Sequence, residues 1–192
     1  MDSHHRKPYY FLFFLALSFC SASHAATQSG IEFVDSLSTD NSTLTLNGTG
    51  TRYFWFIPIY AAALYLTDSS QDADYVINHP HDKRIILHFL YRKVSKDKLL
   101  KTLDQGFSDN LSNEELTAIE QEIEQLKGMF KTVYKGDRIV LDYSPNTGTR
   151  LFLNDELQGA IMGEHFHRAV FRVWLGDKPA DVQLKKGLLT LP

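Results

Sequence analysis

Residues 46–67 read LNGTGTRYFWFIPIYAAALYLT: a glycine-rich start, one cation at Arg52, and then fourteen residues without a charge. The Tyr, Phe, Trp and Ile side chains of this run favour strand. We expect Gly48 and Gly50 to turn the chain into the run, and Pro58 to mark a bulge, an edge position or a hairpin bend. The stretch predicts sheet structure with a single cation at the start of an apolar segment.

Strand patterns lie on both sides of this stretch. Upstream, residues 31–47 alternate apolar and polar side chains as two short strands. Downstream, a strand is expected from Arg84, and residues 137–162 read as a three-stranded antiparallel meander. The polar segment 68–74 is expected to leave the sheet.

Helix signals fall between and after the later strands. Ser95 is placed to cap a helix that runs toward Phe107, and Ser112 precedes a second helix that should stop near Gly128. The final region predicts a helix from residues 163–176 and a short last helix that starts at Asp181. Strands and helix pairs do not alternate as a parallel sheet requires, so the fold class is α+β with an antiparallel sheet.

The N-terminus has the features of a secretory signal peptide. Basic residues precede an apolar segment of eleven residues, 9–19, and small residues follow up to Ala25. The apolar segment is shorter than the roughly 20 residues that cross a bilayer. We therefore expect a signal at 1–25, a single domain at 26–192 and a periplasmic location. The only cysteine, Cys20, lies in the signal, so no disulfide is expected.

Arg52 is the leading candidate for a ligand-binding residue. Its guanidinium stays charged and offers a fork of donors that matches a carboxylate. Nearby aromatic and small residues could wall a cavity around it; they are Tyr53, Phe54, Trp55, Phe56, Ala61, Ala62 and Ala63. Tyr60 and Tyr65 are five residues apart, so one strand would place them on opposite faces. At most one of the two tyrosines shares a site with Arg52.

Other chemistries have weaker support. Glu164, His165 and His167 cluster in the sequence, but their spacing is not that of a metalloprotease helix and no third ligand is evident, so no metal site is expected. No nucleophile motif or phosphate-binding glycine loop is present, and no cofactor is expected. The net charge of −3 at pH 7 gives no electrostatic reason to expect a nucleic-acid partner.

Four segments together resemble the bacterial secreted branch of the chalcone isomerase-like family. They lie at 46–66, 84–99, 136–154 and 163–189, and the most particular features are Gly-x-Gly-x-Arg before an apolar strand pair and Val-Trp-Leu-Gly followed by Pro179. The resemblance implies an open-faced β-sandwich, in which helices cover a large antiparallel sheet and a ligand cleft lies between sheet and helices.

The resemblance also suggests roles for two residues. In plant chalcone isomerases a strand arginine that matches Arg52 steers the reacting phenolate, but their strand threonine is replaced here by Tyr60. Their later site residues fall near Val94, Lys101, Val173 and Trp174, which do not match. Fatty-acid-binding members of the fold pair a tyrosine similar to Tyr60 with the arginine to hold a carboxylate.

Three hypotheses follow. The leading one is a periplasmic, non-catalytic binder of a small amphipathic acid, a fatty acid or a phenolic, held by Arg52 and Tyr60 without stable membrane insertion. The alternative is an isomerase or lyase of the chalcone isomerase type, in which Arg52 stabilises an oxyanion and Tyr60 donates a proton. The third is an envelope interaction module in which the cleft is filled and Arg52 pairs internally with a carboxylate such as Asp142.

Overall fold

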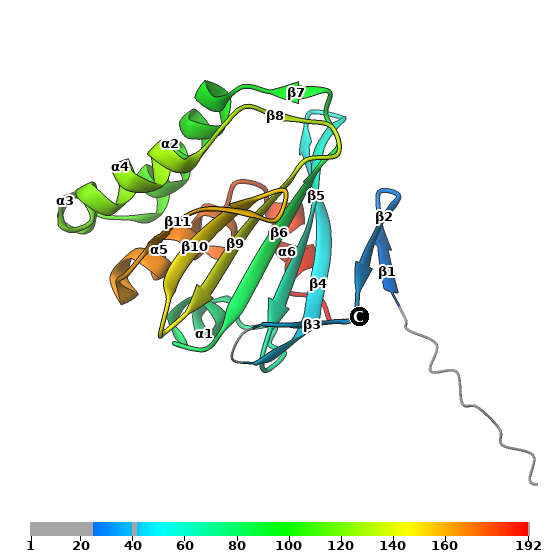
Figure 1. Cartoon of the computed structure of the whole chain (residues 1–192), viewed down its shortest axis with the longest axis horizontal. Coiled ribbons are helices and arrows are strands. Elements are labelled where there is room, and N and C mark those ends of the chain that lie inside the picture. The colour runs from blue at the N-terminus through cyan, green and yellow to red at the C-terminus, as the bar shows by residue number, and fades with distance from the viewer. Residues whose placement is uncertain (1–24, 40–41, 192) are drawn as a thin grey trace, which may run out of the picture.

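The computed structural model describes residues 25–39 and 42–191, and at their centre lies a seven-stranded antiparallel sheet. Its strands follow the order β11-β10-β9-β6-β5-β4-β3 (Figure 1). Their bounds are β3 Ser36–Ser38, β4 Thr43–Phe54, β5 Ile57–Leu66, β6 Lys83–Phe89, β9 Arg138–Ser144, β10 Gly148–Leu153 and β11 Glu156–Ile161. Two small antiparallel pairs join β1 (Ala25–Gln28) to β2 (Ile31–Val34) and β7 (Lys93–Val94) to β8 (Val133–Tyr134). The predicted α+β class with a large antiparallel sheet is confirmed.

Helices lie to one side of this sheet and at one end of it (Figure 1). They are α1 Ala73–Asn78, α2 Lys96–Asn110, α3 Asn113–Ala118, α4 Glu120–Met129, α5 Glu164–Leu175 and α6 Val182–Leu188. The predicted caps are confirmed: Ser95 accepts from a backbone N–H of α2, and Ser112 forms a reciprocal capping box with Glu115. No described helix is long and apolar enough to cross a membrane.

The helical predictions need three corrections. The segment 68–74 leaves the sheet as expected, but an unpredicted helix, α1, begins at its end and is capped by Asp72. The helix after Ser112 is broken into α3 and α4 at Ile119, where φ is −125° and ψ is 20°. Gly128 does not end α4, which continues to Met129.

The two faces of the sheet carry separate apolar cores, as the alternation along β5 shows. Tyr60, Ala62 and Leu64 face the helices in the larger core. Ala61, Ala63 and Tyr65 point the other way and pack with Phe33 and Leu44 in a smaller core beneath the N-terminal segment. The side chain of Tyr60 therefore lies on the helix side of the sheet, and that of Tyr65 on the other.

Gly48 and Gly50 lie within β4 and do not form the predicted turn. A Cβ atom at Gly48 would overlap the backbone carbonyl oxygens of Gly187 and Leu188, and one at Gly50 would overlap the side chain of Leu184. These glycines are needed because α6 packs directly on the strand backbone.

The chain turns instead after the last residue of β4, Phe54. β4 and β5 are joined through Trp55 and Phe56. The register shifts between the Arg52–Tyr60 pair and the Tyr53–Pro58 pair, so the prediction of an irregularity at Pro58 is confirmed. The predicted signal peptide falls almost entirely on residues 1–24, outside the described residues.

Candidate functional site

Arg52 and Tyr60 are directly opposite each other on neighbouring strands β4 and β5. Directly paired residues in an antiparallel sheet extend to the same face, so both side chains lie on the helix side. Tyr65 extends to the other face, where its hydroxyl donates to the carbonyl oxygen of Val34 at 2.9 Å. The predicted separation of the two tyrosines is confirmed, and Tyr65 plays no part in the site.

The Tyr60 hydroxyl is held from the helix side by α5. Trp174 donates its indole N–H to the hydroxyl oxygen of Tyr60 at 3.0 Å. An indole nitrogen can only donate, so the proton of Tyr60 remains available for an acceptor, and no described residue accepts it. Burial raises the pKa of Tyr60, and the nearby charge of Arg52 opposes this rise only in part. Tyr60 is consequently a neutral donor at physiological pH.

Arg52 is half-buried, and its charge is not used in an ion pair with any described residue. Its guanidinium carbon lies 5.9 Å from the centre of the Tyr60 ring, within the range of a cation–π contact. The buried Nε has no hydrogen-bond partner among the described residues. Arg52 and Tyr60 therefore form a pair of donors on one face, with donor capacity that the protein itself leaves unused.

Asp142 is not the partner of Arg52, so that part of the interaction-module hypothesis is wrong. The carboxylate of Asp142 is 2% exposed and accepts hydrogen bonds from Arg84 at 3.2 and 2.9 Å and from Arg150 at 2.7 Å. The three residues are aligned across β6, β9 and β10.

The carboxylate that influences the site is Asp181, which sequence reasoning identified only as a helix start. One of its oxygens accepts from the backbone N–H groups of Gln183 and Leu184 at the start of α6. The other accepts from the N–H of Tyr53 at 3.3 Å, and its charge contributes to the raised pKa of Tyr60. Three backbone donors thus stabilise this carboxylate, which ties α6 to the residue next to Arg52.

The expected cavity wall is not formed, so that prediction is wrong. Ala61, Ala62 and Ala63 are fully buried and divided between the two cores. Tyr53 through Phe56 lie at the end of the hairpin, where Trp55 is 80% and Phe56 82% exposed. The ring of Tyr60 packs edge-on against Phe89 at 5.6 Å between centres. The space beside Tyr60 is occupied by the protein's own rings.

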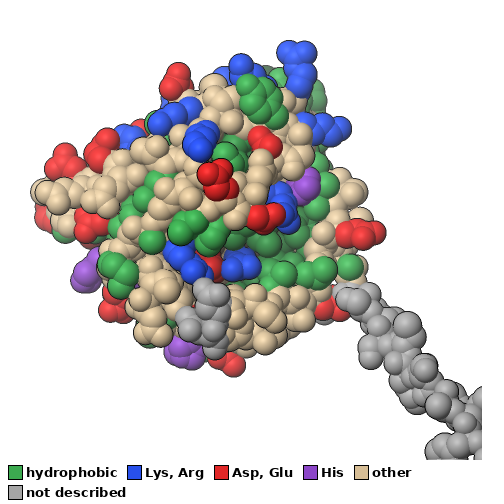
Figure 2. All heavy atoms as spheres, in the orientation of Figure 1, with side chains coloured by type: hydrophobic (Ala, Val, Ile, Leu, Met, Phe, Trp, Pro, Cys, Tyr) green, Lys and Arg blue, Asp and Glu red, His purple; other side chains and the backbone are tan. Residues whose placement is uncertain are grey.

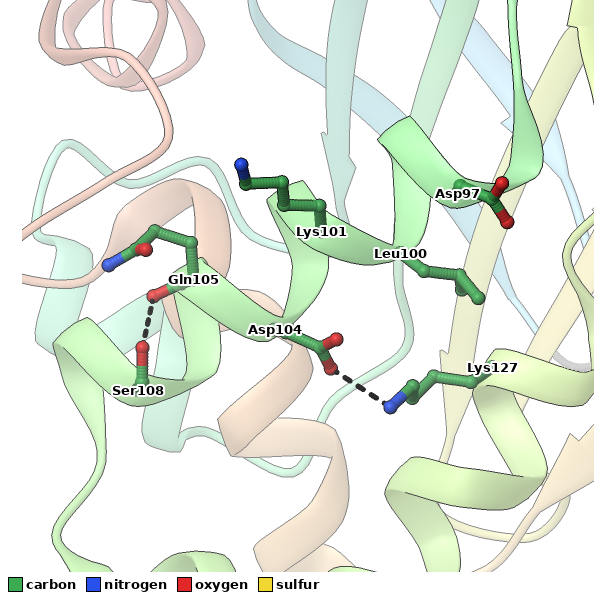
Figure 3. A pocket seen from close by; sticks show the side chains of 7 residues that line it. All are labelled: Asp97, Leu100, Lys101, Asp104, Gln105, Ser108 and Lys127. Carbon is green, nitrogen blue, oxygen red and sulfur yellow. Dashed lines mark hydrogen bonds and ion pairs between the residues drawn. The ribbon is translucent and has the colours of Figure 1, made fainter.

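A hollow in the surface lies elsewhere, between α2 and α4 (Figure 3). It is an open groove of about 520 Å³. Asp104 of α2 and Lys127 of α4 extend toward each other across it and form an ion pair at 3.2 Å. Neither Arg52 nor Tyr60 lines this groove. The groove is therefore separate from the Arg52–Tyr60 pair.

The histidine cluster is divided by burial. His167 is fully buried and stacks on Tyr143 at 3.7 Å between ring centres, whereas Glu164 and His165 are exposed. Across residues 25–39 and 42–191, no three His, Cys, Asp or Glu side chains come together in an arrangement that holds a metal. His167 is instead a buried side chain that packs against the ring of Tyr143.

Comparisons with known proteins agree on the architecture. The family model described as chalcone isomerase-like matches residues 25–190. A crystal structure of a fatty-acid binding protein from Arabidopsis thaliana superposes with a TM-score of 0.69 at 12% identity, covering 86% of this chain and 96% of that one. No curated protein matches the sequence. At this identity the structural match demonstrates a shared fold.

Proposed function

Because the chain belongs to the chalcone isomerase-like family, we propose that it is a non-catalytic binding protein for a small amphipathic acid, whose carboxylate is held by Arg52 and Tyr60. A fatty acid is the favoured ligand, since the structurally similar Arabidopsis protein is a fatty-acid binding protein. A phenolic acid presents the same head group. The signal sequence expected at 1–25 leads us to propose a periplasmic location.

The observation that carries this proposal is the pair of unused donors. The Tyr60 hydroxyl accepts from Trp174, and its own O–H proton has no acceptor among the described residues. Arg52 contributes a positive charge next to it, without an ion-paired carboxylate among the described residues. A carboxylate accepts from both groups at once, and such charge-assisted bonds are about twice as strong as neutral ones.

The apolar part of the ligand must lie outside the filled interior. Tyr60 is 4% exposed and packed against other rings, so no room for an acyl chain exists behind it. Arg52, in contrast, is half-buried and directly precedes Tyr53 and Phe54, which are 47% and 63% exposed. We place the acyl or aromatic body against these side chains, where burial contributes about 25 cal/mol per Å².

The test compares a long-chain fatty acid with the alcohol of the same chain length by titration calorimetry. Only the acid offers a carboxylate, so wild-type protein should bind it more tightly. Arg52→Ala removes a charge-assisted bond worth about 1.5–3 kcal/mol and should weaken acid binding roughly 10- to 100-fold. Tyr60→Phe should weaken acid binding by a smaller factor, because a neutral hydroxyl donor contributes less.

Two control variants separate the site from general effects on the fold. Tyr65→Phe makes the same change on the opposite face of β5 and should leave affinity unchanged. Arg138→Ala removes a cation of β9 that pairs with Asp155 in the β10–β11 turn, and it should also leave affinity unchanged. Equal acid binding by wild type and Arg52→Ala, or equal binding of acid and alcohol by wild type, would contradict the proposal.

The isomerase alternative has less structural support. A group that transfers a proton works best with a pKa near the working pH, whereas the pKa of Tyr60 is raised above its ordinary value of 10.0. Loss of chalcone absorbance in the presence of the purified protein, faster than in buffer, would favour the enzyme and contradict a purely binding role.

A further inference from the structure

The β4–β5 turn presents the most exposed apolar group of the described residues. Five consecutive side chains, 53–57, form what we call the aromatic tip. Their exposed fractions run from 41% at Ile57 to 82% at Phe56, and Trp55 and Phe56 meet edge-on at 6.2 Å. Contiguous exposed apolar surface on a folded domain marks an interaction site.

The backbone at the tip supports this interpretation. Trp55 has a φ of +59°, a conformation in which turns of this kind usually carry Gly or Asn. A bulky residue in this conformation costs conformational energy. Packing in the core does not offset that cost, because the Trp55 side chain is 80% exposed. An indole at this position is therefore best explained by what it contacts outside the protein.

The neighbouring segment adds further aromatic rings. The backbone N–H groups of Leu90 and Tyr91 both donate to the carbonyl oxygen of Ile59, which fixes the start of the β7–β8 segment beside the tip. Tyr91 is 40% exposed, and Tyr134 on β8 is 52% exposed. The exposed aromatic surface thus extends beyond the hairpin.

The same segment supplies positive charge. Arg92, Lys93 and Lys135, which we call the basic ledge, are exposed and form no ion pair with described residues. The N–H of Lys135 donates to the carbonyl oxygen of Arg92 at 3.3 Å, so these residues lie together. Figure 2 shows Lys and Arg side chains gathered at this end of the molecule, where Figure 1 places β7, β8 and the β4–β5 turn.

We propose that the aromatic tip and the basic ledge dock the protein on an anionic lipid surface. Trp and Tyr side chains concentrate at the interface between head groups and acyl chains, where their rings are buried and their polar atoms stay wet. Unpaired Lys and Arg side chains at the same level are attracted by anionic head groups. A tip that protrudes enters a lipid layer without needing a complementary groove.

This inference goes beyond the ligand proposed above and does not depend on it. Arg52 directly precedes the tip, so a docked protein holds the Arg52–Tyr60 pair close to the head groups. Membrane docking can be measured without any added acid, and acid binding can be measured without any vesicle. Failure of one proposal is therefore distinguishable from failure of the other.

The experiment uses residues 25–192, which contain both apolar cores and exclude the apolar segment 9–19. The protein is sedimented with vesicles of phosphatidylcholine alone and of phosphatidylcholine mixed with phosphatidylglycerol. Wild type should sediment with the anionic vesicles, and high salt should release it. The chain has two tryptophans, and Trp174 is 5% exposed, so a blue shift of emission on binding reports Trp55.

Matched variants assign the binding to the tip. Trp55→Ser with Phe56→Ser should reduce vesicle binding at least tenfold, whereas Leu157→Ser with Met162→Ser, two exposed apolar residues on and just after β11, should not. Lys93→Glu with Lys135→Glu should abolish the preference for anionic vesicles. Trp55→Phe should keep sedimentation and lose the blue shift. Equal thermal unfolding of all variants confirms that they fold.

Three outcomes would overturn the proposal. One is a wild-type protein that sediments with neither kind of vesicle. Another is equal binding by wild type and by the double-serine variant of the tip. The third is a wild-type dimer in lipid-free solution that the double-serine variant converts to a monomer, which would assign the tip to contact with a second copy of the chain.

Discussion

At the scale of single residues, the least expected feature is a pair of buried basic groups between β6 and α5. Lys83 is 2% exposed, donates to the carbonyl oxygens of Val76 and His79 at 2.5 and 2.6 Å, and lies 5.6 Å from the centre of the Tyr143 ring. The imidazole of His167 stacks on the same ring at 3.7 Å between ring centres. Lys83 therefore satisfies carbonyls at the C-terminal end of α1 and raises the cost of placing charge on His167.

His167 should make the fold sensitive to acid. Burial, with the charges of Lys83 and Arg168, lowers the pKa of His167 to about 3, while backbone groups of Ile77 and Glu164 oppose the shift. The unfolded chain takes up this proton near the ordinary pKa of 6.5, before the folded state does. The free energy of unfolding should thus fall as pH falls from about 6.5 toward 3, at up to about 1.4 kcal/mol per pH unit.

The measurement is urea unfolding of wild type and His167→Phe at pH 7 and pH 4.5. The variant keeps an aromatic ring against Tyr143 and cannot be protonated, so its loss of stability between the two pH values should be smaller. Tyr143→Phe, which leaves the histidine in place, serves as the control. Equal losses for wild type and His167→Phe would show that other groups govern the acid response.

At the scale of elements, α6 packs directly on the backbone of β4. Leu184 and Leu188 of α6 are buried in the core, and the backbone of Gly187 approaches the backbone of the strand. This contact places Asp181, the cap of α6, beside Tyr53 and so next to Arg52. The position of the site thus depends on how closely one short helix approaches one strand.

Substitution by alanine should change the stability of the protein in opposite directions at two glycines. Gly48→Ala introduces a Cβ against the carbonyl oxygens of Gly187 and Leu188, which cannot move without shifting α6, and should destabilise the protein by about 1–3 kcal/mol. Gly128→Ala, within α4 and with nothing near its Cβ position, should stabilise it by up to about 1 kcal/mol. Urea unfolding measures both, and a neutral Gly48→Ala would contradict the close approach.

Local signals made most elements predictable from the sequence. Ser112 and Glu115 could be identified as a capping box because the bonds between them span three residues. Gly48 could not be placed in a strand from local sequence. A glycine is required there because α6, about 140 residues later in the chain, packs against the strand at this position. The placement of Tyr60 and Tyr65 on opposite faces of the sheet could be predicted from the alternation of side chains along a strand. The exposed tip was missed because an aromatic run looks the same whether it is buried or lies in a turn.

At the scale of the whole molecule, the sheet separates a large helix-side core from a small one on its other face. The small core contains Phe33, which is 5% exposed, and is covered by the β1–β2 hairpin. Hydrogen bonds from Tyr65 to Val34 and from Gln28 to Thr51 hold this hairpin against the sheet. Few buried side chains secure it, so the two faces should differ in local stability.

Hydrogen exchange followed by mass spectrometry under native conditions tests this difference. Amides of residues 25–34 should exchange by local opening, whereas those of β5, β6 and β9, which lie inside the sheet, should exchange only on global unfolding. Phe33→Ala should accelerate exchange mainly in the hairpin. Phe171→Ala, in the helix-side core, should accelerate exchange throughout because it lowers global stability by about 3–5 kcal/mol. If Phe33→Ala instead accelerated exchange equally in the hairpin and in β6, the two cores would unfold as a single unit, and the hairpin would be as firmly held as the centre of the sheet.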